Sequence, residues 1–317
     1  MCAHASSWRN GTGQHNARDC GAAVYREQGN VQNPVQPAHC NYLSEHIAMP
    51  LTVYDHPLSP YGQKVKLALL EKHVPFVAAL PSGIGSGSTP DDFIAASPRG
   101  EVPALIDGDV RLFDSTVILE FIEERWPSPP LMPTGALARA RVRMIEDAMD
   151  THFEAITWGM SELINFGRAE GALKDAMLAE AAAQIRRWHV WLEAKLGNAA
   201  YFGGDRFDRA DICVAPFLNG AAGFGIAPAE DSALGKWLAR VNQRPSMRSV
   251  RADIAEMARQ TDPTGGLAGV RELVRSGKFK REYRDHRLEW MVKTGGISVV
   301  IEGLERQNIR FIPEFSA

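Results

Sequence analysis

Cysteine, charge bias and long apolar runs are all scarce in this 317-residue chain, and each scarcity excludes a class of protein. Three of its four cysteines lie within the first forty residues and no C-x-x-C pair occurs, so neither a disulfide framework nor a thiol redox motif is supported. The 35 Lys and Arg nearly balance the 38 Asp and Glu, which gives no general attraction to nucleic acid or anionic membrane. No apolar run is long enough to cross a bilayer. A reducing, cytoplasmic setting fits these features best.

The first 48 residues differ in composition from the rest. They are polar, rich in Asn, Gln, Gly and His, and lack apolar periodicity. Such a segment cannot bury enough surface to fold alone, and it has no apolar stretch typical of a secretory signal. We expect residues 1–48 to be a disordered extension or to reflect a mis-assigned start.

Residues 49–128 carry the signals of a small α/β domain. Residues 51–56 read as a strand, and 59–73 as an amphipathic helix with Ser59 at its N-cap and Pro60 just inside. The signals that follow are a strand over 75–80, a helix over 89–97 capped by Thr89, a hairpin formed by VPALID and VRLF, and a helix over STVILEFIEERW. The order β-α-β-α-β-β-α predicts a parallel pair joined to an antiparallel hairpin, the thioredoxin-like arrangement.

The strand signals stop after a proline-rich linker. An all-helical domain is expected over 136–260, with helices at 136–165, 173–197, 209–224, 232–243 and 246–260. In FDRADI, Asp208 has the features of an N-cap and Asp211 lies at N3, which predicts a capping box. Residues 261–317 predict an extension of two or three short helices. Its basic stretch, KFKREYRDHR, is interpreted as a solvated helix face, and ISVVIEGL is expected to dock on the body and flank the active-site cleft.

The pair Asp114-Ser115 stands at a strand-to-helix corner and permits two interpretations. An Asp or Ser at this position is a good helix cap. The unpaired N–H groups and positive dipole end of a first helical turn also favour an anion, such as a ligand carboxylate.

Three stretches together resemble the glutathione transferase superfamily, in the style of its serine-type classes such as phi, tau and theta. They are DHPLSPYGQKV, SPRGEVPALIDGDVRLFDSTVILEFIEERWP and FDRADICVAPFL, and the resemblance covers roughly residues 51–250. It implies glutathione as co-substrate, a hydrophobic electrophile as second substrate, and a homodimer. It implies no nucleic-acid or membrane partner and no metal.

The resemblance also implies roles for five residues. Asp114 and Ser115 resemble the clamp for the γ-glutamyl end of glutathione, with Asp114 pairing with the ammonium group. Val102 precedes Pro103, whose peptide bond is expected to be cis, and offers its backbone to the cysteinyl unit. Ser59, at a helix N-terminus, is then the hydroxyl that favours the thiolate over a thiol of ordinary pKa near 8.5.

Several assignments remain open at this stage. Tyr54 and Tyr61 are rivals of Ser59 for the activating hydroxyl. Gln63, Lys64 and Arg99 are candidates for the glycyl carboxylate, although surface charge is the simpler interpretation of each. Four apolar residues of the helical domain have the character of an electrophile pocket, but residues of this kind more often form the core: Trp158, Met160, Phe166 and Phe217. His152, His189 and His286 are scattered and predict no metal site.

The motifs do not decide between related functions. A specialised glutathione-dependent dehalogenase or β-aryl etherase would begin with the same thiolate, and only the second pocket would differ. A maleylacetoacetate isomerase is disfavoured because the Ser-Ser-x-Cys stretch typical of that group is missing. A non-catalytic binding or regulatory module is a third possibility, which the intact set of Ser59, Val102-Pro103 and Asp114-Ser115 disfavours.

Overall fold

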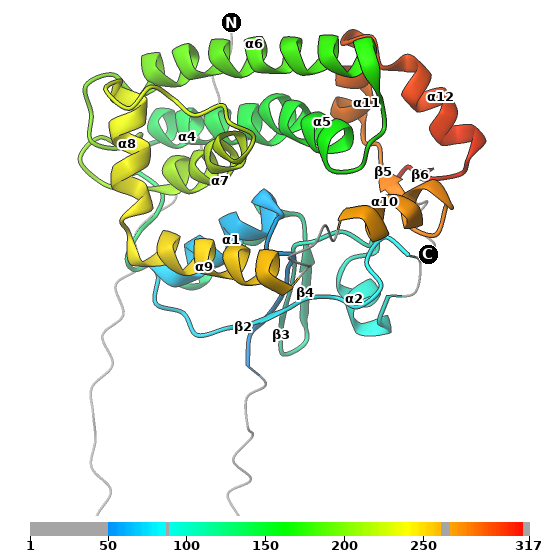
Figure 1. The fold of residues 1–317 in the computed structure, drawn as a ribbon. Helices are drawn as coiled ribbons and strands as arrows, with labels where there is room; N and C mark the ends of the chain where they lie inside the picture. Colours follow the sequence, from blue (N-terminus) through cyan, green and yellow to red (C-terminus); the bar gives the residue numbers. More distant parts are fainter. Residues whose placement is uncertain (1–49, 87–88, 261–266, 313–317) are drawn as a thin grey trace, which may run out of the picture. The chain divides into compact units, whose positions relative to one another are not determined.

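A four-stranded mixed sheet forms the centre of the first part of the chain (Figure 1). The computed structural model describes residues 50–86, 89–260 and 267–312, so the expectation for residues 1–48 lies outside the described residues. The elements of the first part are β1 (Thr52–Tyr54), α1 (Pro60–Glu71), β2 (Val77–Ala79), α2 (Asp91–Ala96), β3 (Ala104–Asp107), β4 (Val110–Phe113) and α3 (Ser115–Arg125). The strand order is β2-β1-β3-β4, with β1 parallel to β2 and antiparallel to β3. This is the thioredoxin-like arrangement that the sequence predicts.

Two helices cover one face of this sheet and one covers the other. Val53 of β1 and Leu105 of β3 are paired and fully buried, in one apolar cluster with Val65 of α1 and Ile118 of α3. On the opposite face, Phe93 of α2 is buried in a smaller cluster. The alternation of strand side chains therefore feeds both layers, and it holds the N-termini of α1 and α3 at fixed places beside the sheet.

The start of α2 corrects one expectation. The sequence places Thr89 at the N-cap with Pro90 at the first helical position, but the helix begins at Asp91 and Pro90 is the N-cap. No side chain caps the helix by a hydrogen bond. Proline has no N–H that could be left unpaired in either position. Its fixed φ also suits the residue before the helix as well as the first helical residue.

The second part of the chain is helical, as predicted. Its elements are α4 (Ala136–Ala148), the π-helical segment η1 (Met149–Phe153), α5 (Glu154–Ile164), α6 (Gly171–Leu196), α7 (Arg209–Gly223), α8 (Ala233–Asn242) and α9 (Pro245–Gln260). The expected helix over 136–165 is a continuous run in which η1 inserts a wider turn. Such π segments occur often at functional sites. In the described part of the chain, no helix combines the length and apolar character needed to span a membrane.

The predicted capping box at the start of α7 is confirmed. The side chain of Asp208 accepts from Ala210 N at 2.8 Å, and that of Asp211 accepts from Asp208 N at 2.9 Å. Asp211 also accepts from Phe202 N at 3.0 Å and from Trp237 Nε1 at 2.7 Å. A single buried carboxylate thus joins α7, α8 and the loop before α7.

The extension contains three helices and a small sheet within its described residues. Its elements are α10 (Leu267–Arg275), β5 (Arg281–Glu282), α11 (Asp285–Lys293), α12 (Ile297–Glu305) and β6 (Ile309–Arg310), and β5 pairs with β6 in parallel. ISVVIEGL forms most of α12 and docks on the body, because Val299 and Val300 are buried in the main core cluster. The expectation that it flanks the cleft is wrong: β5 and α11 do so instead.

Substitution of Asp211 tests how much the second domain depends on its buried carboxylate. Asp211→Ala leaves two buried donors and one half-buried donor unpaired, each at a cost of about 1–3 kcal/mol, so we expect a loss of roughly 3 kcal/mol or more in the free energy of unfolding. Urea unfolding measures it. Asp205→Ala, an exposed neighbour in the same loop, is the matched control and should change stability by less than about 0.5 kcal/mol. Equal effects of the two substitutions would contradict this account of the fold.

Candidate functional site

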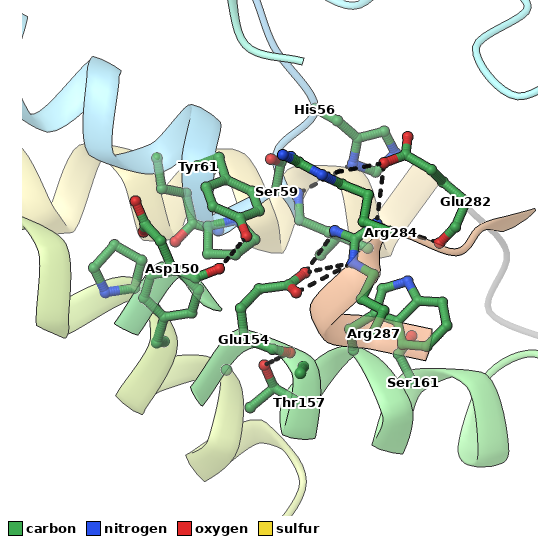
Figure 2. A pocket seen from close by; sticks show the side chains of 18 of the residues that line it. His56, Ser59, Tyr61, Asp150, Glu154, Thr157, Ser161, Glu282, Arg284 and Arg287 are labelled. Carbon is green, nitrogen blue, oxygen red and sulfur yellow. Dashed lines mark hydrogen bonds and ion pairs between the residues drawn. The ribbon is translucent and has the colours of Figure 1, made fainter. Parts of the chain in front are cut away.

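One large cleft brings together all five residues that the sequence assigns to the site. Ser59, Val102, Pro103, Asp114 and Ser115 line it. Its walls come from the loop after β1, the segment before β3, the start of α3, the helices η1 and α5, and the extension at β5 and α11. Part of the cleft is shown in Figure 2. In the described part of the chain, no group of three or more His, Cys, Asp or Glu could hold a metal ion.

Ser59 lies at the N-cap of α1, as predicted. Its Oγ accepts from Gly62 N at 3.2 Å, and Pro60 occupies the first helical position. The hydroxyl keeps its own proton for a further acceptor, and it stands at the positive end of the helix dipole. A thiolate placed beside Oγ would therefore meet one donor and a favourable field.

The Val102-Pro103 peptide bond is cis, which confirms the prediction. Val102 directly precedes β3, whose first residue, Ala104, pairs with Phe113 of β4. Among the described residues, no backbone hydrogen bond engages Val102 itself. Its N–H and C=O are thus available to an extended ligand lying beside the cis bond.

Asp114 is the N-cap of α3, and only one of its two oxygens takes part in the cap. Oδ1 accepts from Thr116 N at 3.0 Å and Val117 N at 3.4 Å, while Oδ2 lies 3.5 Å from Nη1 of Arg99. The backbone of Asp114 has φ 76°, which is uncommon for a residue other than glycine and concentrates at functional sites. Ser115 is buried beside it. The cap and the binding role are therefore compatible.

The two tyrosines that rival Ser59 lie differently. Tyr54 packs edge-on against Phe93, with ring centroids 5.2 Å apart, and does not line the cleft. Tyr61 lines the cleft, but its hydroxyl donates to Asp150 O at 2.6 Å. Burial, followed by the charges of Glu154 and Asp150, raises the pKa of Tyr61 well above its ordinary value. Neither phenol is therefore as well placed as Ser59 to donate to a thiolate.

The three candidates for binding the glycyl carboxylate differ in their position relative to the cleft. Lys64 is fully buried and pairs with Asp150 at 2.6 Å and Glu146 at 3.3 Å, so it is neither a surface charge nor a cleft residue. Gln63 lines the cleft but donates through Nε2 to Pro57 O at 2.7 Å. Arg99 lines the cleft and faces Asp114.

The basic stretch of the extension is not a solvated face, which corrects the sequence interpretation. Arg287 of α11 donates two hydrogen bonds to the carboxylate of Glu154 of α5, from Nη2 at 2.6 Å and from Nε at 3.1 Å (Figure 2). Arg281 of β5 donates from Nε to Glu162 of α5 at 2.5 Å. Tyr283 also donates to Glu162, at 3.2 Å. Burial opposes the ionisation of Glu154, but Arg287 and His286 bring its pKa down to about 2. These ion pairs hold the extension against the cleft wall.

A sequence signal for these pairs was present but lay in another helix. In EAITWGMSELI, Glu154 and Glu162 stand among apolar residues, eight positions apart. An acid buried in such a helix needs a cation from elsewhere. Arg281, Arg284 and Arg287 repeat every three residues and match that need, although only the structure joins the two stretches.

Three of the four apolar candidates for the electrophile pocket line the cleft. These are Trp158, Phe166 and Phe217, whereas Met160 is buried elsewhere. The ring of Phe217 meets that of Tyr61 edge-on, with centroids 5.9 Å apart. The cleft therefore has an aromatic side next to the end of α1.

Family models and individual relatives agree on one family. The model described as glutathione S-transferase, N-terminal domain, matches residues 53–130, and that described as glutathione S-transferase, C-terminal domain, matches residues 149–245. The extension lies beyond both matches. A stringent starvation protein A homolog of Coxiella burnetii is 27% identical over 67% of this chain and 96% of its own length. Glutathione S-transferase 3 of Zea mays is 32% identical over 51% of this chain and 74% of its own length.

Solved structures show the same likeness. A glutathione S-transferase from Rhodospirillum rubrum is 28% identical, with a TM-score of 0.55 over 63% of this chain and 91% of that one. FzlA from C. crescentus is 27% identical, with a TM-score of 0.57 over 64% and 92%. Both halves of the fold are thus matched, and the maize enzyme exceeds 30% identity over most of its length. The chain belongs to the glutathione S-transferase superfamily.

Proposed function

We propose that this protein is a glutathione transferase in which Ser59 favours the thiolate of bound glutathione, and that the thiolate attacks a hydrophobic electrophile. One observation supports this most directly: the N-termini of α1 and α3 and the cis Val102-Pro103 segment line the same cleft. Each of the three suits a different part of one tripeptide.

In the proposed complex, glutathione lies along the thioredoxin-like side of the cleft. Its γ-glutamyl carboxylate meets the first turn of α3 and the Ser115 hydroxyl, and its ammonium group meets Oδ2 of Asp114. The cysteinyl unit pairs with the backbone of Val102. That places the sulfur toward Ser59, at the tip of α1.

The chemistry then requires only that the thiol lose its proton near neutral pH. A free thiol has a pKa near 8.5, so little of it is ionised at pH 7. A hydrogen bond from Ser59 Oγ and the dipole of α1 both favour the anion, and each unit of lowered pKa corresponds to about 1.36 kcal/mol. The thiolate attacks the electrophilic centre and a leaving group departs. The protein positions and ionises a nucleophile that glutathione supplies.

The same scheme serves a specialised dehalogenase or a β-aryl etherase, which differ only in the second substrate. A non-catalytic module is the alternative of a different class. Relatives of this chain include proteins named stringent starvation protein A homolog and FtsZ-localized protein A. Glutathione binding without turnover of an aryl halide, an epoxide, a chlorinated aromatic or a β-aryl ether would support that alternative.

We further propose a homodimer in the cytoplasm. Val117 of α3 is 50% exposed and Met144 of α4 is 65% exposed. The two helices are neighbours, since Arg143 pairs with Glu120 at 2.9 Å. Two apolar side chains on adjoining helices are suited to an interface with a second copy.

Ser59→Ala tests the activating hydroxyl. Loss of a hydrogen bond to a charged group costs about 1.5–3 kcal/mol, so we expect the pKa of the bound thiol to rise by roughly 1–2 units and kcat/KM near pH 6.5 to fall roughly 10- to 100-fold. The KM for glutathione should change little. Ultraviolet titration of the bound thiolate and steady-state kinetics with 1-chloro-2,4-dinitrobenzene measure both effects. Tyr54→Phe is the control and should behave as wild type. A large loss of activity in Tyr54→Phe, together with retained activity in Ser59→Ala, would refute the assignment of Ser59 as the activating hydroxyl.

Asp114→Asn distinguishes the role of Asp114 as a helix N-cap from its proposed role in binding the γ-glutamyl end of glutathione. Asparagine keeps an oxygen for Thr116 N and Val117 N and tolerates a positive φ, so the free energy of unfolding should change by less than about 1 kcal/mol. The negative charge that faces the glutamyl ammonium is lost, and glutathione affinity by calorimetry should fall roughly tenfold or more. Unchanged affinity would show that Asp114 is only a helix cap.

A further inference from the structure

Arg284, which directly precedes α11, lines the cleft close to Glu282 and Arg287 (Figure 2). Its Nη1 lies 3.7 Å from Glu101, the residue before Val102, and Tyr61 lines the same cleft. It therefore lies where the proposed glutathione site meets the aromatic side of the cleft. It comes from the part of the chain that neither family model matches.

The guanidinium of Arg284 lies within hydrogen-bond distance of no acceptor among the described residues. Its nearest carboxylate oxygens, on Glu101 and Glu282, lie 3.7 and 3.9 Å away, and its Nε is buried without a partner. By contrast, Arg287 forms an ion pair with Glu154 at 2.6 Å, and Arg310 forms one with Glu282 at 2.9 Å. A guanidinium has five donors in a planar fork that matches a carboxylate. Arg284 thus keeps donors for a ligand.

The local charge balance also leaves one cation in excess. Burial, together with a hydrogen bond and the charge of Glu282, raises the pKa of Glu101 to about 8, so Glu101 is mostly neutral at pH 7. Glu282 faces three guanidiniums, at 3.9 Å from Arg284, 3.6 Å from Arg287 and 2.9 Å from Arg310. Apart from Glu101, which lies 3.7 Å from Arg284, Glu154 is the only other acid paired with these three arginines within 4 Å in the described part of the chain. Three positive charges therefore meet two negative ones.

We propose that Arg284 forms a carboxylate-binding subsite in the cleft, and that the electrophile of this enzyme is an aromatic or similarly apolar molecule with an acidic group. The inference rests on the proposed function. The aromatic body would lie against Tyr61, Phe217 and Trp158, and its carboxylate would occupy the fork of Arg284. The glycyl end of glutathione offers the same chemistry, so the experiment must distinguish these two sources.

Two electrophiles that differ in charge test the subsite on the full chain. The anionic probe is 4-chloro-3,5-dinitrobenzoate and the neutral one is 1-chloro-2,4-dinitrobenzene. Arg284→Met should lower kcat/KM for the anionic probe roughly 10- to 100-fold, the range of a charge-assisted hydrogen bond, through a higher KM. The neutral probe should change less than about twofold, because it places no charge at the fork. Arg284→Lys should recover part of the loss.

Arg275→Met is the matched control, because Arg275 is an exposed arginine of the same extension, paired with Glu272 outside the cleft. It should leave both probes unchanged, and thermal melting should show that all variants fold. Equal losses for both probes in Arg284→Met would overturn the proposal. So would a matching rise in the KM for glutathione, which would assign Arg284 to the glycyl carboxylate.

A binding measurement keeps this test separate from the proposed function. Calorimetry with 3,5-dinitrobenzoate and 1,3-dinitrobenzene, in the presence of S-methylglutathione, requires no turnover. Wild type should bind the acid more tightly than the neutral ring, and Arg284→Met should remove that preference. If the preference exists without any conjugation, the subsite stands and the transferase function fails. If conjugation occurs and Arg284→Met leaves the preference intact, the subsite fails alone.

Discussion

Two helix N-termini open onto one cleft, and the rest of the site depends on that convergence. Each N-terminus brings unpaired N–H groups and a positive dipole end, together with a hydroxyl-bearing residue: Ser59 for α1 and Ser115 for α3. The pairing of β1 with β3 fixes both, because Val53 and Leu105 bury α1 and α3 against the same face of the sheet. A ligand with a carboxylate at one end and an ionisable thiol further along fits this arrangement.

The extension completes the cleft through charge and not through apolar packing alone. Glu154 and Glu162 lie buried on α5, and a buried carboxylate without a cation would be costly. Arg287 and Arg281 supply those cations from α11 and β5. Arg310 reaches the other wall, where it donates to Arg99 O at 3.0 Å, beside the Val102-Pro103 segment. The extension therefore contacts both halves of the fold at the site, and residues outside both family-model matches line the cleft.

Local signals predicted most of the fold and much of the candidate site. The alternation in β1, the periodicity of α1 and the capping box at Asp208 are short-range features, and each is found in the structure. The cis bond at Val102-Pro103 was implied by the family resemblance, since a proline at the start of a strand does not by itself predict it. The predictions that failed concern contacts between residues that are far apart in the sequence. Nothing within KFKREYRDHR indicates that its arginines meet acids more than a hundred positions earlier. The burial of Lys64 has the same cause, since its partners Glu146 and Asp150 come from the second domain.

The most direct test of the account is the proton released when glutathione binds. Calorimetric titration of the full chain near pH 7, in two buffers of different ionisation enthalpy, measures it, with S-methylglutathione as the ligand that has no thiol proton. The account predicts that both ligands bind and that only glutathione releases protons in excess, because the tip of α1 favours its thiolate. Absence of glutathione binding, or equal proton release by the two ligands, would contradict it.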